Sequence, residues 1–123
     1  MDSQSNMIQN RLKQAQQLEI QIEQLMNQKY QLDLRVKELE RTLKELSEVK
    51  EDSPVYKAVG PLLYKVDDRK KLVDELEEQK ELSSVRIKTL EKNQKALEDK
   101  YKELEAVLKK TYQDSKGSLI MQV

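Results

Sequence analysis

The side chains that could do chemistry in this 123-residue chain are mostly carboxylates and amines, 23 Asp and Glu against 23 Lys and Arg. The sequence has no His and no Cys, so it lacks the commonest general base, the commonest zinc ligand and any thiolate. Gly60 and Gly117 are the only glycines, which leaves no glycine-rich loop to hold a phosphate. The acidic residues alternate with Lys and Arg, as they do on solvated faces of long helices. We therefore predict that the chain is not an enzyme and that it holds no cofactor and no metal.

The charge balance argues against polyanionic partners. The formal net charge is zero, so no field steers the chain to nucleic acid or to an anionic membrane. The basic clusters Arg69-Lys70-Lys71 and Lys109-Lys110 are short and flanked by acidic residues. No apolar run approaches the about 18 residues of a membrane-spanning helix, and the polar start of the chain is unlike a signal peptide. We expect a cytoplasmic protein with no nucleic-acid or membrane partner.

Most of the chain is predicted to form a coiled coil. With 37% hydrophobic and 37% charged residues it cannot fill a thick core, whereas a coiled coil buries only one seam. Residues 5–50 place five leucines at d positions of a heptad repeat, at Leu18, Leu25, Leu32, Leu39 and Leu46. Residues 67–114 repeat the frame, with its apolar positions at Val73, Leu76, Ile87, Leu90, Leu97, Leu104 and Leu108. Asp67 or Asp68 is the candidate N-cap of this second helix.

Residues 54–66 interrupt the helical pattern. β-Branched and aromatic residues gather over Val55 to Val59 and Leu62 to Val66, on either side of Gly60-Pro61. This predicts two short strands joined by a turn in which Gly60 takes a positive φ. The predicted fold class is mainly α, a single domain in which an antiparallel two-helix coiled coil carries a central β-hairpin. Residues 115–123 are expected to be a flexible tail.

Two registers satisfy the antiparallel heptad frame. One pairs Leu18 with Tyr101, and the other pairs Leu18 with Leu108. Leu25 faces Gln94 in the first register and Tyr101 in the second. We prefer the first, because it is centred nearer the turn.

Polar residues also fall on the seam, at Lys29, Lys80, Ser83 and Gln94. Polar seam residues commonly fix the register of a coiled coil. Alternatively, the lysine stems lie along the seam and keep their ammonium groups in water. We favour the second interpretation for the lysines.

The predicted hairpin carries more apolar surface than its own chain can cover. Its large apolar residues are Val55, Tyr56, Val59, Leu62, Leu63, Tyr64 and Val66. An isolated two-stranded hairpin is marginal in water, and its open edges invite pairing. We expect strands of several subunits to join into an oligomeric β-barrel, which makes these seven residues the oligomerisation surface. The alternative is that the hairpin packs back onto its own helices.

At this point the residues carry a resemblance to a known family. Asp52-Ser53-Pro54-Val55-Tyr56-Lys57, Val59-Gly60-Pro61-Leu62-Leu63 and Lys65-Val66, flanked by two equal helices, resemble a β-class prefoldin subunit. Val85-Arg86-Ile87-Lys88-Thr89-Leu90-Glu91-Lys92 adds to the likeness, which covers roughly residues 8 to 112. The class includes the archaeal beta subunit and eukaryotic subunit 6, and Gly60-Pro61 favours the eukaryotic form. The apolar tail Leu119 to Val123 departs from the family pattern and is assigned no role.

The resemblance implies a function. Prefoldins are hetero-hexamers of two α-class and four β-class subunits, with a double β-barrel platform and six coiled coils. They hold non-native proteins between the coiled-coil tips and pass them to a group II chaperonin without ATP. In eukaryotes the usual clients are nascent actin and tubulin.

The ends of the two helical segments supply the candidate client-binding residues, Met7, Ile8, Leu12, Val107, Leu108 and Tyr112. Flexible and apolar side chains there can adapt to varied clients, and contacts from several coiled coils would add as avidity. The alternative is that Ile8 and Leu108 simply finish the seam. A different function also stays open, that of a coiled-coil tether or scaffold that oligomerises through its hairpin and binds no client.

Overall fold

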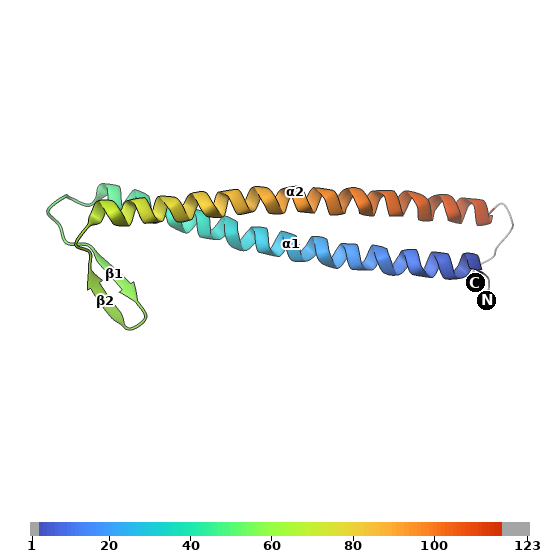
Figure 1. Ribbon diagram of the computed structural model, residues 1–123, viewed down its shortest axis with the longest axis horizontal. Coiled ribbons are helices and arrows are strands. Elements are labelled where there is room, and N and C mark those ends of the chain that lie inside the picture. Colours follow the sequence, from blue (N-terminus) through green and yellow to red (C-terminus); the bar gives the residue numbers. More distant parts are fainter. Residues whose placement is uncertain (1–2, 117–123) are drawn as a thin grey trace. The chain divides into compact units, whose positions relative to one another are not determined.

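The computed structural model describes residues 3–116 and contains two long helices with a hairpin between them in the sequence (Figure 1). Helix α1 spans Ser3–Glu48, strand β1 Tyr56–Val59, strand β2 Leu62–Lys65 and helix α2 Arg69–Lys116. The predicted helices and antiparallel hairpin are confirmed. Residues 115 and 116, which we assigned to the tail, instead continue α2, and the apolar residues Leu119 to Val123 lie outside the described residues.

The hairpin forms because the two residues between its strands suit a tight turn. Val59 pairs with Leu62, and Gly60 takes a φ of 56°, the left-handed conformation that a glycine adopts without strain. The antiparallel register continues to Tyr56 opposite Lys65. Beyond the last pair, the Val66 amide donates to the Val55 carbonyl over 2.8 Å. Both strands are thus one residue shorter at their outer ends than predicted.

The helix ends beside the hairpin are held by two side chains. Asp68 is the N-cap of α2, since its Oδ1 accepts a hydrogen bond of 3.0 Å from the Lys71 amide. Arg69 lies against the last turn of α1 and donates to the carbonyls of Leu46, Val49 and Lys50. Arg69 thereby adds a charged donor to these three carbonyls, of which those of Leu46 and Lys50 also accept hydrogen bonds from the amides of Val49 and Ser53.

The chain divides into two compact units, Met1–Gln28 with Leu90–Val123, and Lys29–Thr89. In each unit the half-buried and buried residues of the helices follow the predicted a and d positions. Leu39 and Leu46 are buried in the second unit, and Leu90 in the first. All three are d residues, so the core is a narrow seam, as the heptads predict.

Contacts within the first unit fall between the two predicted registers. Leu18 and Leu104 line one hollow, and the hydroxyl of Tyr101 donates to Glu19, the neighbour of Leu18, over 2.7 Å. Leu25 shares its hollow with Leu97 rather than with Tyr101. Leu18 therefore lies level with Leu104, which is three residues from its partner in the first register and four from its partner in the second.

Candidate functional site

The hairpin exposes the residues that we assigned to oligomerisation. Leu63 is 71% exposed and Tyr56 58%, and Val59, Leu62 and Tyr64 are each about half exposed. Val55 and Val66 are half-buried just outside the strands. Five large apolar side chains on eight strand residues therefore face water.

Apolar residues occupy both faces of the hairpin. The strand register places Tyr56, Ala58 and Leu63 on one face and Val59, Leu62 and Tyr64 on the other. One covering layer would leave the second face in water. Both faces and both strand edges thus remain available to other chains.

One side of the hairpin faces a hollow of about 460 Å³ within the Lys29–Thr89 unit. Val55, Tyr56 and Ala58 line it together with residues of the α1 end and the α2 start, among them Leu46 and Leu76. The strand side chains nevertheless remain exposed. This arrangement does not support the alternative in which the hairpin is packed against its own helices.

The candidate client-binding residues lie on helical turns that are linked to each other. Arg11 donates to the Thr111 hydroxyl over 3.4 Å, which joins the first turns of α1 to the last turns of α2. The structure exposes four of the six candidates to between 41% and 57%, namely Met7, Leu12, Val107 and Tyr112. Ile8 and Leu108 are half-buried at a positions of the seam. Those two therefore fit the alternative of a seam role, and the other four present apolar surface.

The polar seam residues Lys29, Lys80, Ser83 and Gln94 are all half-buried. The Nζ of Lys80 lies 3.7 Å from Oε1 of Glu40, and the two side chains are 39% and 52% exposed. An ion pair this exposed contributes at most about 1 kcal/mol. Lys80 thus fits the interpretation in which the lysine stem follows the seam.

Four residues each make polar contacts with the other helix that the sequence did not predict, and one of them is Arg35, which donates to Gln79 over 3.1 Å. Arg11, Thr111 and Arg69 all fall on d positions of the heptad frame, which was a usable signal of partners across the seam. Tyr101 was assigned only to the seam, yet its hydroxyl binds the Glu19 carboxylate. This hydrogen bond is the first cause of the raised pKa of Tyr101, followed by desolvation and by the charges of Glu19 and Glu105.

Within the described part of the chain, carboxylates form no group of three that could hold a metal ion. The described helices contain no stretch with the length and apolar character needed to cross a membrane. The surfaces that could bind other molecules are the exposed hairpin, the helical ends and the grooves beside the seam.

Comparison with known proteins gives consistent matches. The family model described as "Prefoldin subunit" matches residues 9–115. The chain is 58% identical to prefoldin subunit beta of Thermoplasma volcanium over 94% of each chain. It is 52% identical to prefoldin subunit beta of Thermoplasma acidophilum, over 90% of this chain and 91% of the other.

A solved structure supports the same assignment. The crystal structure of the prefoldin beta subunit from Thermococcus strain KS-1 has a TM-score of 0.77 and 34% identity to this chain. The match covers 85% of this chain and 90% of the other. All three similar proteins are archaeal, so they give no support to the eukaryotic form that Gly60-Pro61 favoured.

Proposed function

The chain belongs to the prefoldin subunit family, and from this premise we propose that it is the β-class subunit of a chaperone that works without ATP. The subunit joins a hetero-hexamer of two α-class and four β-class chains. The observation that carries the proposal is the hairpin, whose two faces expose Tyr56, Leu63 and three further large apolar residues. Such a surface is stable in water only when other strands cover it.

The client-binding surface lies at the ends of the helices. Met7, Leu12, Val107 and Tyr112 offer exposed apolar contacts on turns that the Arg11–Thr111 hydrogen bond joins. Each contact is weak, but several coiled coils acting on one non-native protein multiply their effect. Ile8 and Leu108 are half-buried on the seam and would contribute only if the helices separate at their ends.

The held protein passes to a group II chaperonin in the cytoplasm. Nascent actin and tubulin would be clients in a eukaryotic source. Because the similar proteins are archaeal, we make the proposal for non-native proteins in general.

A dilution assay tests the proposed function. The full chain is mixed with an α-class prefoldin subunit, and a chemically denatured protein that aggregates on dilution is added. The mixture should keep that protein soluble without ATP. Aggregation at the rate of the denatured protein alone would instead favour the tether or scaffold.

A further inference from the structure

A stripe of glutamines runs along one side of α1. We call Gln14, Gln17, Gln21, Gln24 and Gln28 the glutamine stripe. Their spacing alternates between three and four residues, which keeps them on one helix face. All five are exposed, and all belong to the Met1–Gln28 part of the first unit.

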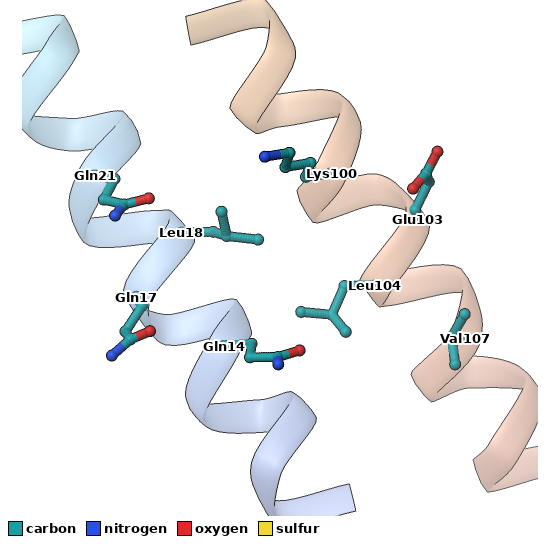
Figure 2. Close-up of a pocket in the computed structure, with 8 residues that line it drawn as sticks. All are labelled: Gln14, Gln17, Leu18, Gln21, Lys100, Glu103, Leu104 and Val107. Atoms are coloured by element: carbon teal, nitrogen blue, oxygen red, sulfur yellow. The ribbon is translucent and has the colours of Figure 1, made fainter. Parts of the chain in front are cut away.

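The glutamine stripe borders two hollows between the helices of this unit. Gln14, Gln17 and Gln21 line the first, of about 430 Å³, and Gln21, Gln24 and Gln28 line the second, also about 430 Å³. Figure 2 shows Leu18 and Leu104 pointing toward each other in the first hollow, with the amide of Gln14 extending into the same space. Because Gln21 lines both hollows, they form one groove with an apolar floor that the glutamines border on its α1 side.

The groove is nearly uncharged, although 37% of the chain is charged. Lys100 and Glu103, of opposite sign, are the charged residues of the first hollow, and the second is lined without charged residues. All five glutamine side chains are exposed, so their amides are accessible from solvent. Each amide offers a donor and an acceptor, and a peptide backbone requires the same two groups.

The length of the groove suits a short stretch of extended chain. From Gln14 to Gln28 the stripe runs about 21 Å along the helix axis. An extended strand of about six residues spans that distance. A folded protein already hydrogen bonds most of its backbone N–H and C=O groups internally, so few of them remain to bind the glutamine amides.

We propose that the glutamine stripe hydrogen bonds the exposed backbone of an extended, non-native polypeptide whose apolar side chains enter the groove. The inference rests on the proposed chaperone function and adds to it a recognition chemistry that is independent of client sequence. The helical ends supply apolar contacts, and the stripe selects chains whose backbone is unpaired.

The test uses the full chain, alone and assembled with an α-class subunit, and two fluorescent probes. One probe is an uncharged Ser-Val repeat peptide. The other is a depsipeptide of the same side chains in which esters replace alternate amides and remove their N–H donors. Binding is followed by fluorescence anisotropy for the wild type, for Gln14→Met with Gln21→Met, and for Gln9→Met with Gln16→Met as the matched control outside the groove.

The wild type should bind the peptide more tightly than the depsipeptide. Gln14→Met with Gln21→Met should weaken peptide binding about tenfold and remove the difference between the probes, since two hydrogen bonds are lost while side-chain length is kept. The control pair should bind as the wild type does. Melting temperature and complex mass are measured for every variant.

Two results would overturn the inference. One is equal binding of both probes by the wild type, and the other is unchanged binding after Gln14→Met with Gln21→Met. A complex that keeps a denatured protein soluble but does not distinguish the probes would contradict the role of the stripe and leave the proposed function intact. Probe discrimination in a complex that cannot keep the protein soluble would instead refute the proposed function.

Discussion

The guanidinium of Arg69 donates a hydrogen bond of 2.7 Å from Nη2 to the carbonyl oxygen of Val49. The same side chain donates to the carbonyls of Leu46 and, over 3.0 Å, Lys50. The first residue of α2 thus closes the C-terminal end of α1, where the helix dipole favours a positive charge. This contact ties together the two helix ends from which the hairpin emerges.

Replacing this side chain tests its structural role. Arg69→Ala should lower the free energy of unfolding by about 2 kcal/mol, because three carbonyls lose their hydrogen bonds to a charged donor. Lys70→Ala, at the next position and exposed, should change it by less than about 0.5 kcal/mol. Urea denaturation followed by circular dichroism measures both, and equal losses would refute the capping role.

The hydrogen bond between Tyr101 and Glu19 predicts a pH dependence. It raises the pKa of Tyr101 above the ordinary 10.0, so the folded chain holds the phenolic proton more tightly than the unfolded chain. The hydrogen bond therefore contributes fully to the stability of the folded chain below pH 10.0. This contribution disappears as the pH rises through the folded-state pKa of Tyr101. Glu19→Gln should lower this pKa.

Ultraviolet titration of the tyrosines measures this shift. Because the chain has five tyrosines, the curve of a Tyr101→Phe variant is subtracted to isolate Tyr101. Glu23→Gln is the control, one turn away on α1. If the pKa of Tyr101 is the same in the Glu19→Gln variant and the wild type, the hydrogen bond is not its cause.

Charge placed on the hairpin should prevent assembly. Tyr56 and Leu63 lie on the same face, and covering them after Tyr56→Asp with Leu63→Asp would bury carboxylates at a cost of several kcal/mol. The hexamer should disappear while helical content largely survives. Leu82→Asp with Val85→Asp, at exposed positions of α2, is the matched control and should leave the mass unchanged. A hexamer formed by the hairpin variant would contradict its role.

Polar substitutions at the helical ends should weaken client holding without affecting assembly. Met7→Ser, Leu12→Ser and Val107→Ser together remove three exposed apolar contacts from each β-class subunit. Several times more complex should then be needed to keep a denatured protein soluble. Ile20→Ser, Met26→Ser and Leu34→Ser remove equally exposed apolar residues of α1 and serve as the control. Equal activity of the two triple variants would argue against the helical ends as the binding surface.

The sequence predicted the seam and the hairpin because both depend on local spacing. Sevenfold leucines identified Leu39 and Leu46 as seam residues, and β-branched residues around Gly60-Pro61 located the strands to within one residue. The heptad frame also placed Ile8 and Leu108 at a positions, so their half-burial was readable in advance.

The polar contacts between the helices were harder to predict. The carbonyls bound by Arg69 lie 19 to 23 positions earlier in the chain, so the contact exists only once the chain has folded back. Tyr101 and Glu19 are 82 positions apart, and their contact depends on a register that periodicity alone left open between two choices.

The most direct test of the account is the native mass of the full chain with and without an α-class prefoldin subunit. The exposed hairpin predicts that the mixture assembles through its strands, and the proposed function predicts that the product is a single hexamer with two α-class chains and four copies of this chain. A mixture that keeps the small oligomers of the separate chains would contradict the account and leave a coiled-coil tether in its place.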